Sequence, residues 1–225
     1  MSITQSRPTQ VAERRSTPRA KGPFPATPDS RVVVGDVLVW LAGLGLGVVV
    51  AIELLTRTAV SGPGALLTEA GRWTALVGTY ASLLLLVLVA RVPLLERSVG
   101  MDRLMSWHRK IGPVALLLIA AHVVLTTLGY ASSTAVSWLA QTWDFATVYP
   151  WILPAMAGFV LMLVGGFTSW RVARRRMKYE TWWVTHLYFY LAIALAYLHQ
   201  VLYGQQFVDH AWARYVWIGM YAVTV

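Results

Sequence analysis

The chain has 225 residues, of which 57% are hydrophobic and only 13% are charged, and it contains no cysteine. A soluble domain carries charge on about a quarter of its residues, so this composition and the long apolar runs predict an integral membrane protein. The absence of cysteine excludes disulfides, thiolate metal sites and cysteine nucleophiles. The net charge of +9 does not indicate nucleic acid as a partner, because the basic residues follow a membrane topology.

The first part of the chain, residues 1–31, is rich in Arg, Pro, Ser and Thr and has almost no large apolar side chains. Such a segment cannot bury a core, so we predict a disordered, basic cytoplasmic tail. No short apolar stretch with a small-residue cleavage site follows it, so a removable signal peptide is not predicted. Residues 32–225 are predicted to form one transmembrane domain.

Five long apolar segments follow the tail, and a sixth one is shorter. The long segments are residues 32–56, 70–90, 105–130, 151–170 and 182–203, and the short one is residues 213–225. Because a spanning helix needs about 20 residues, we expect an all-α bundle of six transmembrane helices whose sixth helix is incomplete, as in a sequence that ends inside it. The connections are predicted to be a short interfacial helix at residues 94–106, a polar loop at 131–150 and a basic loop at 171–178.

The first apolar segment contains Gly43, Gly45 and Gly47, which resemble a nucleotide-binding glycine pattern. The strand, helix and acidic residue that such a site requires are missing, so these glycines are interpreted as helix-packing positions. Glu53 and Arg57 are four residues apart near the end of this segment, a spacing that allows them to pair.

The distribution of Lys and Arg predicts the orientation in the membrane. Of the 19 basic residues, 16 fall in the tail and in the regions that precede the third and fifth apolar segments. Only Arg57, Arg72 and Arg214 fall on the other side. The positive-inside rule therefore predicts a multi-pass protein of the cell membrane, surrounded by lipid, with its N-terminus in the cytoplasm.

Four of the five histidines lie in the third and fifth apolar segments: His108 and His122 in one, His186 and His199 in the other. The spacings of 14 and 13 residues correspond to about 20 Å along a helix. Since both helices run in the same direction, they predict two cross-helix pairs, His108 with His186 and His122 with His199. Two imidazoles facing each other across a bundle are what a six-coordinate haem needs. Ionisable residues within a membrane are costly and indicate function.

The angular positions of the histidines around their helices support the two pairs unequally. Fourteen residues bring His122 back to within about 40° of His108, whereas 13 residues leave His199 about 140° from His186 on a straight helix. We therefore expect either a bend in the fifth helix or two haems that sit differently against it. The fifth histidine, His210, falls in a loop and is interpreted as a surface residue.

The stretch Trp107–Gly112 with His122, and the stretch Tyr179–His186 with His199, resemble the ferric reductase-like transmembrane domain. That family includes NADPH oxidases and ferric-chelate reductases, and the chain is similar to a bacterial-type member truncated before its dehydrogenase module. The resemblance covers roughly residues 32–225. It implies two b-type haems stacked between the third and fifth helices, with the four histidines as iron ligands. It also implies FAD and NAD(P)H on a cytoplasmic flavin dehydrogenase module, in cis beyond residue 225 or in trans.

The resemblance implies a membrane oxidoreductase. Electrons would pass from a cytoplasmic flavin or NAD(P)H donor through the two haems to a ferric chelate or dioxygen at the outer face. Superoxide-producing members tend to have a further histidine one turn after the outer ligand, and Thr126 at this position counts against dioxygen. One alternative is a stand-alone haem-binding membrane subunit that passes electrons from quinol or a separate flavoprotein to a periplasmic reductase. Another is a transporter or channel without redox chemistry.

Haem propionates need cationic or hydrogen-bonding partners. At the inner face the candidates are Arg109 and Lys110, which adjoin His108. At the outer face Arg57 and Arg72 are the candidates, with Arg214 as the remaining cation. No residue is predicted to be catalytic in its own right.

Overall fold

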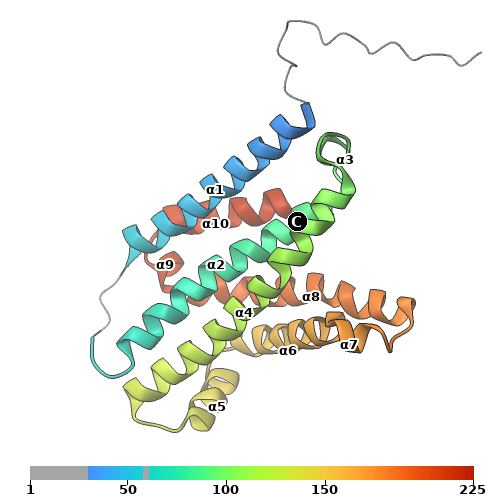
Figure 1. Cartoon of the computed structure of the whole chain (residues 1–225). Helices are drawn as coiled ribbons and strands as arrows, with labels where there is room; N and C mark the ends of the chain where they lie inside the picture. The colour runs from blue at the N-terminus through green and yellow to red at the C-terminus, as the bar shows by residue number, and fades with distance from the viewer. Residues whose placement is uncertain (1–29, 58–60) are drawn as a thin grey trace, which may run out of the picture.

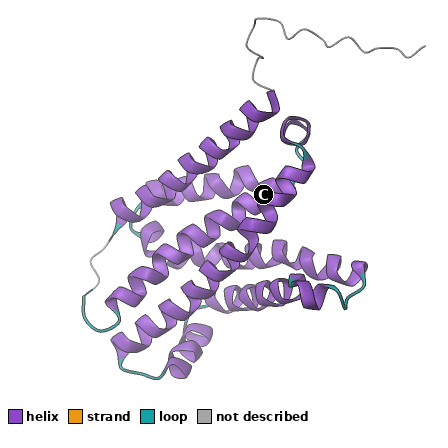
Figure 2. Ribbon diagram, viewed as in Figure 1, coloured by secondary structure: helices purple, strands orange, loops and turns teal. Residues whose placement is uncertain are grey.

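The computed structural model describes residues 30–57 and 61–225 (Figure 1). Within these ranges the chain forms helices joined by short loops and contains no strand (Figure 2). The prediction of an all-α membrane protein is therefore confirmed. Nearly all of the predicted tail, residues 1–29, lies outside the described residues.

The helices, in chain order, are α1 (Ser30–Thr56), α2 (Ala65–Val89), α3 (Pro93–Val99), α4 (Met101–Thr134), α5 (Trp138–Val148), α6 (Ile152–Ser169), α7 (Arg171–Arg174), α8 (Tyr179–Tyr203), α9 (Gln205–Val208) and α10 (Ala211–Thr224). Five of the described helices, α1, α2, α4, α6 and α8, are long and apolar enough to cross a membrane. The last helix, α10, has 14 residues, which is shorter than a bilayer requires. The count of six spanning helices thus remains a prediction.

Three connections differ from the sequence-based expectation, one of them being the predicted basic loop at residues 171–178, which begins with the short helix α7. The interfacial helix α3 ends at Val99 instead of continuing to residue 106, because Gly100 has a φ of 89° and separates it from α4. A positive φ is readily adopted by glycine and interrupts a helix. The region predicted as a polar loop contains α5, whose first turn is capped by Ser137: its hydroxyl accepts a hydrogen bond from the amide of Ala140 at 3.2 Å.

Glycines spaced seven residues apart bring α2 close to α4. Gly64, Gly71 and Gly78 all face α4, and a Cβ at Gly78 would lie only 3.0 Å from Leu118 Cβ. A Cβ at Gly71 would meet the hydroxyl of Thr126. Small residues at such positions let two membrane helices approach backbone to backbone, which apolar side chains alone would prevent.

The helices α6 and α8 pack in a similar way. Gly158 and Gly165 are also seven residues apart on α6, and both face α8. A Cβ at Gly158 would lie 2.7 Å from the carbonyl oxygen of Ala192, and one at Gly165 would meet the ring of Phe189. The transmembrane core therefore consists of two close helix pairs, the α2–α4 pair and the α6–α8 pair, which Figure 1 shows adjacent to each other.

The interior is apolar where the helix pairs meet α1 and α10. Val49, Ile52 and Leu83 are among the largest completely buried side chains, together with Trp217 of α10. Many large apolar side chains point outwards instead, including Trp40 on α1, which is 79% exposed. This pattern suits a chain whose outer surface faces lipid.

We expect Gly129→Ala to destabilise the α2–α4 pair. A Cβ at Gly129 would lie 2.8 Å from the backbone nitrogen of Thr68, and backbone cannot yield as a flexible side chain can, so overpacking should cost about 1–3 kcal/mol. Thermal unfolding of the detergent-solubilised protein measures this cost as a lower midpoint. Gly43→Ala is the matched control, because a Cβ there meets no atom within 4 Å. Equal midpoints for the two variants would contradict the role of the glycines.

Candidate paired-histidine site

His108 and His186 face each other between α4 and α8. Their ring centres are 6.1 Å apart, and both rings line a cavity of about 230 Å³. Gly112, one turn after His108, lines the same cavity, and a Cβ there would meet no atom within 4 Å. The absent side chain at Gly112 therefore leaves space beside the two imidazoles.

The separation of these rings suits a shared metal ion. With a metal–nitrogen distance of about 2.0–2.1 Å on each side, two imidazoles that share one ion have ring centres a little over 6 Å apart. The observed 6.1 Å lies in that range. Among the described residues no group of three or more His, Cys, Asp or Glu side chains is placed to hold a metal ion. Each of the two cavities is instead lined by two histidines.

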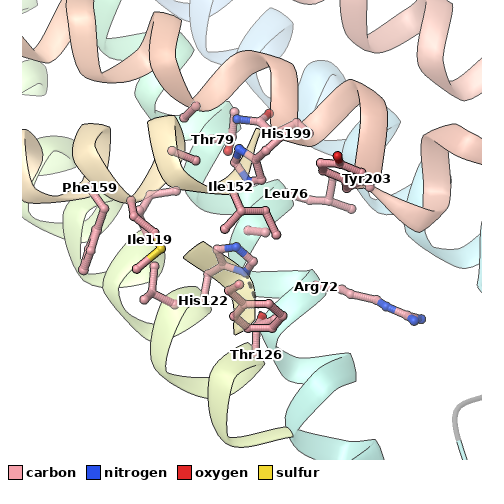
Figure 3. Close-up of a pocket in the computed structure, with 18 of the residues that line it drawn as sticks. Arg72, Leu76, Thr79, Ile119, His122, Thr126, Ile152, Phe159, His199 and Tyr203 are labelled. Carbon is pink, nitrogen blue, oxygen red and sulfur yellow. Dashed lines mark hydrogen bonds between the residues drawn. The ribbon is translucent and has the colours of Figure 1, made fainter. Parts of the chain in front are cut away.

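His122 and His199 line a second, larger cavity of about 560 Å³. Figure 3 shows His122 of α4 and His199 of α8 approaching this cavity from opposite sides. Apolar side chains such as Leu76, Ile119 and Phe159 form much of the wall. His122 and His199 thus lie together as the second pair predicted from the sequence. Because the first histidine of α4 lies beside the first of α8, and the second beside the second, the two helices run in the same direction.

Hydrogen bonding fixes the tautomer of His122. Its Nδ1 lies 2.9 Å from the carbonyl oxygen of Gly71 on α2, and 3.1 Å from the hydroxyl of Thr126. A carbonyl oxygen only accepts hydrogen bonds, so Nδ1 must carry the proton and Nε2 must carry the lone pair. This is the form in which an imidazole binds a metal through Nε2 while its other nitrogen donates to a second group.

A serine does the same for His186. The hydroxyl of Ser169 at the end of α6 donates to the carbonyl of Gly165 at 2.7 Å, which uses its only proton. The same oxygen lies 3.1 Å from Nδ1 of His186 and accepts from Nε1 of Trp182 at 3.3 Å. With the Ser169 proton directed at Gly165, Nδ1 of His186 is the donor to Ser169, and its Nε2 is free to act as a ligand.

The other two imidazoles are held differently. Nδ1 of His108 and Nδ1 of His199 are buried and make no hydrogen bond of good geometry in the described part of the chain, although a backbone group of Leu85 lies near His108 and one of Ala196 near His199. Buried polar nitrogens without a partner are rare in folded proteins and call for an explanation such as a bound ion or group. Each cavity thus combines one imidazole whose Nδ1 has a well-placed acceptor with one whose buried Nδ1 makes no hydrogen bond of good geometry.

The helical phase does not prevent this pairing. The helix α8 is unbroken from Tyr179 to Tyr203, although His186 and His199 are 13 residues apart on it. The two histidines line different cavities, so they need not share one face of the helix. The lining of two separate cavities agrees with the second expectation, that the two sites are placed differently against α8.

The cations predicted to assist the site have different surroundings. Arg72 lines the His122/His199 cavity, and its guanidinium donates to the side chain of Gln205. Arg57 forms an ion pair with Glu69 of α2, so the pairing with Glu53 suggested by sequence spacing is wrong. Arg109 and Lys110 are exposed, and neither is among the described residues that line the His108/His186 cavity.

Sequence reasoning missed Gly71 and Ser169 and gave other surroundings to Glu53 and His210. The carbonyl of Gly71 and the hydroxyl of Ser169 accept hydrogen bonds from His122 and His186, and neither group has a distinctive sequence pattern. The seven-residue spacing of the glycines that face α4 can, however, be seen in the sequence. Glu53 is completely buried, and its Oε2 accepts a hydrogen bond from Gln206 at 2.6 Å. His210, interpreted as a surface residue, is only partly exposed and its Nδ1 is buried.

Together these features define a multi-pass helical membrane protein whose partly buried histidines are paired between two parallel helices. The family model described as ferric reductase like transmembrane component matches residues 74–197, more than half of the chain. The chain belongs to this family, as its histidine motifs indicated. The matched region includes His108, His122 and His186 and ends two residues before His199. Searches of curated proteins and of solved structures returned no significant match.

We expect Ser169→Ala to change the tautomer of His186. In the unaltered protein, nitrogen-15 NMR of labelled histidine should show His122 and His186 with the proton on Nδ1, because of the acceptors described above. Without the hydroxyl, His186 should lose this preference while His122 keeps it. Thr168→Ala is the matched control, since the hydroxyl of Thr168 donates to the carbonyls of Val164 and Gly165. A proton found on Nε2 of His186 in the unaltered protein would refute the assignment.

Proposed function

We propose that this chain carries electrons across the membrane by holding two b-type haems, one between His108 and His186 and one between His122 and His199. The observation that carries this proposal is the pair of cavities, each with one imidazole from α4 and one from α8. Membership of the ferric reductase family supports an oxidoreductase role. When bound, haem would supply one-electron chemistry.

The described residues fit such a cofactor in three respects. The cavity walls are largely apolar, as the macrocycle requires. Gly71 and Ser169 orient one ligand imidazole each and leave its Nε2 unprotonated. The partner imidazoles have buried Nδ1 atoms that make no hydrogen bond of good geometry among the described residues. The protein would therefore provide preoriented ligands, exclude water and tune the iron, which is the usual contribution of the protein to haem chemistry.

The distribution of basic residues supports a direction for the electrons. The regions around α3 and α7, together with the first turns of α4, hold ten Lys and Arg residues, so they form the cytoplasmic end in this proposal. Since His108 and His186 come early in α4 and α8, their site lies near that end. A flavin dehydrogenase module, in cis or in trans, would deliver electrons there. The apolar layer of about 30 Å is too thick for a single transfer, which is a physical reason for two sites.

The acceptor would be reduced beside His122 and His199. Arg72 adds a cation to the wall of this cavity, where it would attract a haem propionate or an anionic ferric chelate. Arg57 already neutralises Glu69, so we assign it a weaker influence. Thr126, which contacts His122, occupies the position where superoxide-producing relatives tend to have a further histidine. We therefore propose a ferric chelate in preference to dioxygen.

Substitution of single histidines tests the proposal. The purified protein should contain two haems per chain by extraction, with a reducible Soret band. His122→Ala and His199→Ala should each remove one haem and leave the His108/His186 haem largely in place, because the two cavities are separate. His210→Ala is the matched control and should retain both haems. The proposal fails if the unaltered protein binds no haem, or if both haems persist in His122→Ala and in His199→Ala.

A further inference from the structure

A buried carboxyl group lies close to the larger cavity and has no part in the function proposed so far. Glu53, near the end of α1, is completely buried. Gln206 donates to its Oε2 at 2.6 Å, whereas its Oε1 is buried without a hydrogen-bond partner among the described residues. An ionisable side chain inside a membrane protein is costly to keep there and marks a functional site by default.

The short helix α9 connects this carboxyl group to the cavity. Gln205 and Gln206 both line the cavity that contains His122 and His199. Gln205 accepts from the guanidinium of Arg72 on α2, and its neighbour Gln206 donates to Glu53 on α1. Only one amide side chain therefore separates the Glu53 carboxyl group from the cavity wall.

Opposing influences act on the charge of Glu53. Complete burial favours the neutral acid. The amide of Gln206, which donates to Oε2, favours the carboxylate, and Arg72 brings a positive charge to the neighbouring Gln205. When such influences compete, a moderate change in local charge shifts the balance between the two forms. An electron that arrives in an adjacent apolar cavity is such a change, because charge is poorly screened there.

We propose that Glu53 is a proton-binding site coupled to the electron in the His122/His199 cavity. When one electron enters that cavity, the Glu53 carboxylate takes up one proton and becomes the neutral acid. When the electron leaves for the acceptor, the proton is released, so charge and atoms balance and no other bond changes. Gln206 is the positioning residue: its N–H holds Oε2 and directs Oε1 towards the unpartnered side. This inference rests on the proposed function.

Redox titration of the haem-loaded protein at a series of pH values tests the coupling. The potential of the centre that disappears in His122→Ala should fall as pH rises, with a slope approaching one proton per electron over part of the range. Glu53→Gln should remove this slope. Glu69→Gln is the matched control: it changes a carboxylate that already pairs with Arg57, and it should keep the slope. A pH-independent potential in the unaltered protein, or an unchanged slope in Glu53→Gln, would overturn the proposal.

Infrared difference spectra provide a second measurement that does not depend on how well Glu53→Gln folds. Reduction should produce the C=O stretch of a protonated carboxylic acid. Gln206→Leu should raise the pH below which this band appears, because the carboxylate loses its hydrogen-bond donor. A reduced-minus-oxidised spectrum without such a band, or a band unmoved in Gln206→Leu, would refute the role of this pair. Protein without haem would refute the proposed function instead, so the two failures are distinguishable.

Discussion

The arrangement of the site depends on how closely α2 approaches α4 at Gly71. A side chain at this position would collide with the hydroxyl of Thr126, and the backbone carbonyl of Gly71 could then no longer reach His122 at 2.9 Å. One backbone contact therefore sets the distance between two helices and the tautomer of an imidazole. Gly64 and Gly78, seven residues to either side, maintain the same approach along the interface.

The α6–α8 pair also orients a histidine, but through a side-chain hydroxyl instead of a backbone carbonyl. Gly165 allows α8 to pack closely, and its carbonyl anchors the hydroxyl of Ser169, which in turn accepts from His186. Each helix pair thus orients one histidine, and the two oriented histidines belong to different cavities. A ligand imidazole whose remaining N–H has a fixed acceptor is already oriented before a metal binds, and loss of such a partner typically lowers metal affinity about 10- to 100-fold.

The histidine pairs could be predicted from the sequence because helix spacing and the parallel direction of α4 and α8 determine which residues lie at the same depth. The five long apolar helices could be predicted for a similar reason, since length and hydropathy suffice. Glu53 was assigned the wrong partner, because its contact with Gln206 joins segments 153 residues apart and local spacing carries no information on it. The helix α5 was missed because its 11 residues are too few to span a membrane and it lies in a segment that also holds several Ser and Thr residues. Ser169 was missed because a hydroxyl near a helix end has many ordinary roles.

Transfer of electrons across the membrane is the central claim, and vesicles of known orientation test it most directly. Haem-loaded protein is reconstituted, a reductant is supplied at the face that carries α3 and α7, and an impermeant ferric chelate is supplied at the opposite face. The account predicts that the chelate is reduced and that a membrane potential develops, both lost in His122→Ala. Reduction that occurs only when donor and acceptor share one face would contradict the account.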